Sequence, residues 1–115
     1  MANIMSQKNI KELCEQIAEK FHPEKIILFG SYAYGKPNQY SDVDLLVIMP
    51  FNGSPLSQAA KIITQIKPKT AVDLIVRTPE QIQERLMMND SFIKEIFKDG
   101  KVAYEAKHAC LDILI

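Results

Sequence analysis

The chain has few of the residues that mark special classes of protein. Tryptophan is absent, and the 115 residues include only 2 cysteines and 4 glycines. Cys14 and Cys110 show no Cys-x-x-Cys spacing and have no histidine cluster beside them, so neither a zinc site nor a disulfide framework is indicated. We interpret both cysteines as reduced, small residues of the core type.

An excess of charge of either sign is also lacking. Lysine plus arginine total 14 and aspartate plus glutamate total 14, so the formal net charge is zero. A net charge of zero does not favour a nucleic-acid or membrane partner, because proteins that bind such partners usually have a basic surface. We expect no direct nucleic-acid binding, and any polyanion must be met by local groups.

Long apolar runs are missing as well. No run approaches the roughly 20 residues that span a bilayer, and the N-terminal stretch MANIMSQKNIKELCEQ lacks the apolar core of a signal peptide. We therefore expect a cytoplasmic protein with no membrane segment. With 47% apolar residues, the chain fits one globular domain over residues 1–115.

Helices are predicted where apolar residues recur every three or four positions, and strands where short β-branched runs end at glycine or proline. The alternation predicts an α/β (α+β) fold, a small mixed sheet flanked by helices. The predicted elements are a helix at 6–21, a strand at 25–30, a short helix from 31, a strand at 43–49, a helix from 55, a strand at 71–76, helices from 79 and from 91, and a strand at 101–105.

The later helices are each expected to bury one apolar face. Ser54 and Pro55 are predicted to begin the second long helix, and the sequence TPEQ from Thr78 is a capping-box start. The residues predicted to face inward are Leu56, Ala59, Ala60, Ile63 and Ile66 in the first of these helices, Ile82, Leu86 and Met87 in the next, and Phe92, Ile93, Ile96 and Phe97 in the last.

Two aspartates stand one residue apart in the stretch FGSYAYGKPNQYSDVDLLVI. Residues two apart in a strand point to the same face, so Asp42 and Asp44 are predicted to project together. Asp73 interrupts the apolar run TAVDLIV, where a charge is costly, and it joins the pair if its strand lies beside theirs. Clustered carboxylates favour Mg²⁺ or Mn²⁺, and such a cluster can hold two ions for phosphoryl-type chemistry.

A Gly-Ser step precedes the aspartates. Gly30 is predicted to end the first strand and Ser31 to begin the short helix, so backbone N–H groups would face an anion there. Glycine lets a phosphate approach the backbone, and the Ser31 hydroxyl can donate a hydrogen bond to a phosphate oxygen. The stretch as a whole therefore predicts a site for a nucleoside triphosphate with its metal ions.

These motifs resemble a known family. The stretch GSYAYGKPNQYSDVDLLV is similar to the Gly-Ser, then Gly, then Ser-Asp-x-Asp-Leu signature of the DNA polymerase beta-like nucleotidyltransferase superfamily. It is closest to the minimal nucleotidyltransferase (MNT) members, the antitoxin partners of HEPN ribonuclease toxins. The resemblance covers nearly the whole chain. Members often carry a basic residue before the second glycine, where this chain has Tyr34.

The resemblance implies a role for each matching residue. Asp42 and Asp44 would bind two Mg²⁺ ions, and Asp73 would complete the site of the ion that activates the incoming hydroxyl. Gly30 and Ser31 would hold the β- and γ-phosphates of ATP. It further implies AMP transfer (AMPylation) to a tyrosine of a HEPN toxin, which would be silenced in a toxin-antitoxin system.

Other interpretations of the Asp-x-Asp pair and of several single residues remain open at this point. Asp-x-Asp pairs also serve haloacid dehalogenase-like phosphatases, but those expect a threonine where Leu46 stands, and sugar-nucleotide glycosyltransferases need a longer chain. The remaining candidates are Tyr32, Tyr34 and Tyr40, which could stack on a base or simply pack; Lys36, a phosphate contact or a loop lysine; Arg77, which could reach the site or pair with Glu80 or Glu84; and His22 and His108, interpreted as surface or helix-end residues.

Two functional alternatives and one structural question also remain. The protein could be a catalytically silent antitoxin binding module, or an adenylyltransferase for small molecules of the aminoglycoside type. The segment KHACLDILI, residues 107–115, is predicted to be a terminal helix or an ordered tail. It is apolar enough either to fold back on the core or to form a homo- or hetero-oligomer.

Overall fold

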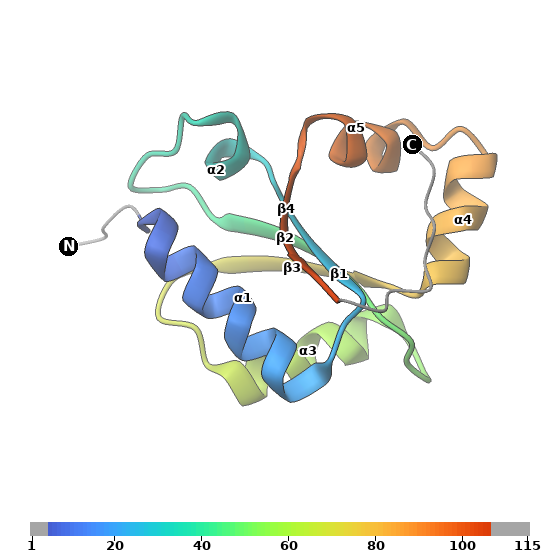
Figure 1. Cartoon of the computed structure of the whole chain (residues 1–115), viewed down its shortest axis with the longest axis horizontal. Coiled ribbons are helices and arrows are strands. Elements are labelled where there is room, and N and C mark those ends of the chain that lie inside the picture. The colour runs from blue at the N-terminus through green and yellow to red at the C-terminus, as the bar shows by residue number, and fades with distance from the viewer. Residues whose placement is uncertain (1–4, 107–115) are drawn as a thin grey trace.

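Four strands form one mixed sheet, and helices cover both of its faces (Figure 1). The computed structural model describes residues 5–106. The strand order is β3-β2-β1-β4, in which β1 runs antiparallel to both β2 and β4, and β2 runs parallel to β3. The elements are α1 (Gln7–Phe21), β1 (Lys25–Phe29), α2 (Ser31–Tyr34), β2 (Val43–Ile48), α3 (Pro55–Ile66), β3 (Val72–Arg77), α4 (Pro79–Met87), α5 (Ser91–Asp99) and β4 (Lys101–Glu105). The predicted fold class and element order are confirmed.

Each face of the sheet has its own apolar cluster. On one face α1 and α3 pack against alternate residues of β1 and β2, such as Ile26 and Leu45. On the other face α4 and α5 contribute Ile82, Ile93 and Ile96 to a second cluster. The two helix pairs lie on opposite sides of the strands in Figure 1. Because strand side chains alternate between faces, these clusters fix the face to which each residue of β1, β2 and β3 points.

The predicted helix starts are confirmed. The hydroxyl of Ser54 accepts a hydrogen bond from the N–H of Ser57 at 3.1 Å, and Pro55 is the first residue of α3. Thr78 and Gln81 form a reciprocal capping box at the start of α4. Each such cap stabilises a helix by about 1 kcal/mol.

The predicted inward faces need four corrections. In α3 the buried residues are Ala59 and Ile62, whereas Leu56 is 82% exposed and Ala60 is also exposed. The sequence PLSQAAKIITQI contains two adjacent apolar stripes, one through Leu56, Ala60 and Ile63 and one through Ala59, Ile62 and Ile66, and the sheet takes the second. Met87 in α4 and Phe92 in α5 are also exposed, by 83% and 49%, because Ile82 and Leu86, and Ile93 and Ile96, occupy the inner faces.

Three further expectations concern single residues and the chain end. Cys14 is buried and free, as predicted. Within residues 5–106, no helix combines the length and apolar character that crossing a membrane requires. Cys110, His108 and the segment 107–115 lie outside the described residues.

Candidate active site

The parallel pairing of β2 and β3 brings the strand aspartates together. In the register of these strands Asp44 lies directly opposite Asp73. Leu46 and Ile48 share the face of Asp44, and Ile75 shares that of Asp73; all three belong to the α4–α5 side of the sheet. The two carboxylates therefore project from neighbouring strands onto one face.

Asp42 is held just before β2 by a short turn. The hydroxyl of Ser41 accepts a hydrogen bond from the N–H of Asn38 at 2.9 Å, and the Asn38 side chain accepts one from the N–H of Tyr40 at 2.7 Å. On the other side of Asp42, the N–H of Val43 donates to the carbonyl of Ala71 at 3.0 Å. The backbone around Asp42 is thus tied both to its own loop and to the chain entering β3.

Gly30 forms the corner beside Asp44. Phe29, the last residue of β1, lies opposite Asp44, and Gly30 then turns the chain into α2 with φ 73° and ψ −158°. A Cβ atom on Gly30 would overlap the Oδ2 atom of Asp44 and would come within 3.0 Å of its Cγ atom. Glycine is required here both by the backbone conformation and by the close approach of this carboxylate.

The environment of Asp44 disfavours its charge. Partial burial is the main cause of its raised pKa, and the negative charges of Asp73 and then Asp42 add to the effect. Asp42 and Asp73 are themselves exposed. The three carboxylates therefore share one electrostatic field, with the half-buried Asp44 at its centre.

The donor set fits a hard divalent cation. Carboxylate oxygens are the ligands that Mg²⁺ prefers, and a cation would relieve the repulsion that raises the pKa of Asp44. Within residues 5–106, no group of three or more acidic, histidine or cysteine side chains is arranged so that it could hold a metal ion by itself. Mg²⁺ usually keeps several waters and shares phosphate oxygens, so a closed protein cage is not the arrangement it needs.

Several other predicted candidates lie away from this group. Tyr32 is only 4% exposed, and its hydroxyl accepts a hydrogen bond from the N–H of Met5 at 3.0 Å. Arg77 ends β3 opposite Ile48, four residues beyond the Asp44–Asp73 pair, so about 13 Å of strand separates it from the aspartates. Its guanidinium donates to the carbonyl of Val76 at 2.7 Å rather than pairing with Glu80 or Glu84. His22 is the exposed C-cap of α1, as interpreted from the sequence.

The exposed candidates lie at the end of α2 and in the loop that follows it. Tyr34 and Tyr40 are 49% and 82% exposed, and Lys36 is exposed in the loop that follows α2. Sequence reasoning missed Phe92, which it placed in the core. Its ring contacts Phe29, the cross-strand neighbour of Asp44. No local pattern in the sequence gives this contact, because it depends on how α5 crosses the sheet.

The sheet topology, the strand-borne carboxylates and the Gly-Ser corner together define a nucleotidyltransferase. The chain belongs to the Nucleotidyltransferase domain family, which it matches over residues 10–104.

Known proteins similar to this chain include one relative and two solved structures. A "putative protein adenylyltransferase" of Methanocaldococcus jannaschii is 30% identical over 101 residues, which are 85% of this chain and 97% of the relative. A "putative nucleotidyltransferase" of Sulfolobus solfataricus has a similar structure, with a TM-score of 0.59, 20% identity, and coverage of 92% of this chain and 86% of the other. A chain from a structure described as a toxin-antitoxin with AMP-PNP gives a TM-score of 0.50 and 19% identity, covering 84% of this chain and 74% of that one. The two structural likenesses support the fold.

Proposed function

We propose that this protein transfers AMP from ATP to a hydroxyl group of another protein, in a reaction that depends on Mg²⁺. The acceptor we propose is a tyrosine of a HEPN-type ribonuclease toxin, so that the protein acts as the antitoxin. The name of the M. jannaschii relative supports protein adenylylation. The structural neighbour from a toxin-antitoxin assembly is consistent with the partner class.

One observation carries the proposal. Asp44 lies opposite Asp73 in the sheet, next to a glycine corner where a Cβ atom would overlap the Asp44 carboxylate. A partly buried carboxylate with two acidic neighbours is unfavourable for the isolated fold. Such an arrangement is explained by a ligand that carries positive charge into the site.

The residues have distinct roles in the proposed reaction. The acceptor oxygen attacks the α-phosphorus of ATP, a new P–O bond forms, and the bond to the β-phosphate oxygen breaks, so that pyrophosphate leaves. Asp42, Asp44 and Asp73 would hold two Mg²⁺ ions, which would stabilise the developing negative charge when bound. Asp73, exposed on the edge strand, would accept the proton of the acceptor hydroxyl. Gly30 and Ser31 would bind the β- and γ-phosphates.

Transfer of label from ATP tests the proposal. The protein is incubated with α-labelled ATP, Mg²⁺ and the product of the neighbouring reading frame, and the label on that product is measured. Wild type should transfer label, and Asp42→Asn together with Asp44→Asn should abolish transfer. Asp99→Asn, an exposed aspartate at the end of α5, is the matched control and should behave as wild type.

Two measurements made alongside it, suppression of toxicity and transfer of label to an aminoglycoside, separate the alternatives. If the double variant still suppresses toxicity and no label moves in the wild type, the protein is a silent binding module. If label moves to an aminoglycoside but not to the neighbouring protein, the acceptor is a small molecule. Each of these results contradicts the proposed acceptor.

A further inference from the structure

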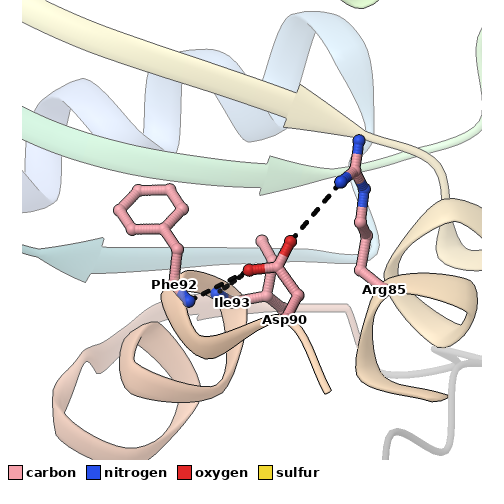
Figure 2. A network of polar contacts seen from close by, with 4 residues as sticks. All are labelled: Arg85, Asp90, Phe92 and Ile93. Atoms are coloured by element: carbon pink, nitrogen blue, oxygen red, sulfur yellow. Dashed lines mark hydrogen bonds and ion pairs between the residues drawn. The ribbon is translucent and has the colours of Figure 1, made fainter. Parts of the chain in front are cut away.

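Phe92 stands out among the side chains of the α4–α5 face. It lies in the first turn of α5, and 49% of its surface is exposed. Its backbone is fixed by Asp90, whose Oδ1 atom accepts hydrogen bonds from the N–H groups of Phe92 at 3.0 Å and Ile93 at 3.2 Å. Arg85 holds the other oxygen of Asp90 at 3.5 Å, as Figure 2 shows.

The ring of Phe92 is also fixed, on its sheet side, by Phe29. The two ring centroids are 5.9 Å apart and the ring planes are nearly perpendicular, at 85°. In Figure 2 the Phe92 ring projects from α5 toward the strands, near the end of β1, while Arg85 lies toward the ends of β2 and β3. An exposed aromatic ring is thus held in one orientation by a helix cap and by an edge-to-face contact.

Phe29 connects this ring to the candidate active site. It is the cross-strand partner of Asp44 and directly precedes Gly30. Side chains of directly opposed residues lie on the same face with Cβ atoms about 4.5–5.5 Å apart. Phe92 therefore stands one side chain away from the central carboxylate, on the same face of the sheet.

We propose that the exposed ring of Phe92 is the surface on which the nucleobase of the triphosphate stacks. The inference rests on the proposed function and adds the part of the site that binds the base. A phenyl ring presents an aromatic face and no hydrogen-bonding group, so it does not read base edges. It favours bases by their stacking area, and the substrate class is therefore purine over pyrimidine nucleoside triphosphates.

Phe92 is better suited to this role than the exposed tyrosines. Tyr40 is 82% exposed, and the hydrogen bond to the Asn38 side chain comes from its backbone N–H and does not fix the ring. Tyr34 ends the four-residue helix α2. Only for Phe92 does the described part of the chain give both a capped helix and an aromatic neighbour that fix the ring.

A fluorescence titration tests the stacking directly. The chain has no tryptophan, so Phe92→Trp introduces a single indole reporter. With Mg²⁺ present, ATP should quench this fluorescence, and inorganic tripolyphosphate, which has no base, should bind without quenching. Met87→Trp, on an 83% exposed residue of α4, is the matched control and should respond to neither ligand.

Calorimetry on the leucine variant gives the second measurement. Phe92→Leu should weaken ATP binding about tenfold and leave tripolyphosphate binding unchanged, because only the base loses its partner. Phe92→Tyr should restore ATP binding and the preference for ATP over UTP. Equal ATP affinity in the wild type and Phe92→Leu, or equal quenching by ATP and tripolyphosphate, overturns the inference while the phosphate site stands. If the wild type binds neither ligand with Mg²⁺, the proposed function itself fails, and the inference fails with it.

Discussion

Replacing Gly30 with alanine should show that the close contact with Asp44 costs stability in addition to ordinary backbone strain. Gly30 has φ 73° and ψ −158°, a conformation that costs a residue with a Cβ atom about 1–3 kcal/mol. The added methyl would also overlap Oδ2 of Asp44, and overpacking of this kind costs about 1–3 kcal/mol more. We expect Gly30→Ala to lower the free energy of unfolding by about 2–6 kcal/mol.

The matched control is Gly35→Ala. Gly35 also has a positive φ, 80°, but no atom lies within 4 Å of the place its Cβ would take. Its replacement should cost only the left-handed backbone strain, about 1–2 kcal/mol. Urea unfolding at constant slope measures both free energies.

Activity provides the second readout of this pair. If the Asp44 side chain rotates away from the new methyl, the stability loss shrinks to the backbone strain, but AMP transfer should still fall about a hundredfold, because a displacement of about 1 Å is that costly to catalysis. Gly35→Ala should transfer AMP as the wild type does. The reasoning is refuted if Gly30→Ala matches Gly35→Ala in both stability and activity.

Four further predictions concern single side chains and the metal. The raised pKa of Asp44 means that the folded state binds this proton more tightly than the unfolded state, so stability falls as pH rises from the ordinary value of 3.8 through the folded pKa. Without metal, Asp44→Asn should therefore have a higher free energy of unfolding than the wild type at pH 7. Urea titrations should show this difference between the two proteins disappearing as pH falls below 3.8. A difference that does not change with pH would contradict the raised pKa of Asp44. Burial raises the pKa of the Cys14 thiol to about 11, so peptide mapping after iodoacetamide treatment at pH 7.5 should find Cys14 labelled only in denatured protein. Ile62→Ala should cost about 2–5 kcal/mol and Leu56→Ala less than about 0.5 kcal/mol, and the reverse order would mean that α3 presents the other stripe to the sheet. Mg²⁺ should bind weakly alone and more tightly with a nonhydrolysable ATP analogue, as calorimetry can show, whereas tight binding without nucleotide would contradict phosphate-assisted binding.

Much of the fold follows from local patterns in the sequence. The capping box at Thr78, the cap at Ser54 and the short apolar strands are signals of a few residues each, and the structure has them where the sequence predicts them. The face of a helix is harder to predict when two apolar stripes are adjacent. In α3 the choice between Leu56 and Ile62 is made by packing against the sheet, which is a long-range effect.

The candidate site shows the same division. Gly30, Asp42, Asp44 and Asp73 could be selected from residue type and spacing, but their proximity depends on the parallel pairing of β2 with β3. From the sequence alone, Asp73 was predicted to join Asp42 and Asp44 only if its strand lay beside theirs. Arg77 was a plausible site residue by its place in the chain, and the direction of β3 carries it to the opposite end of the sheet.

The position of β3 at the margin of the sheet has a consequence for the acceptor. Asp73 lies on the outermost strand, and both it and Asp42 face open solvent, while Asp44 alone is recessed. In the proposed reaction the donor binds beside the recessed Asp44, and the acceptor reaches Asp73 from the solvent. The choice of acceptor then depends on how the surface of the acceptor fits the surface around Asp73. A folded protein can therefore be modified without unfolding to reach the active site.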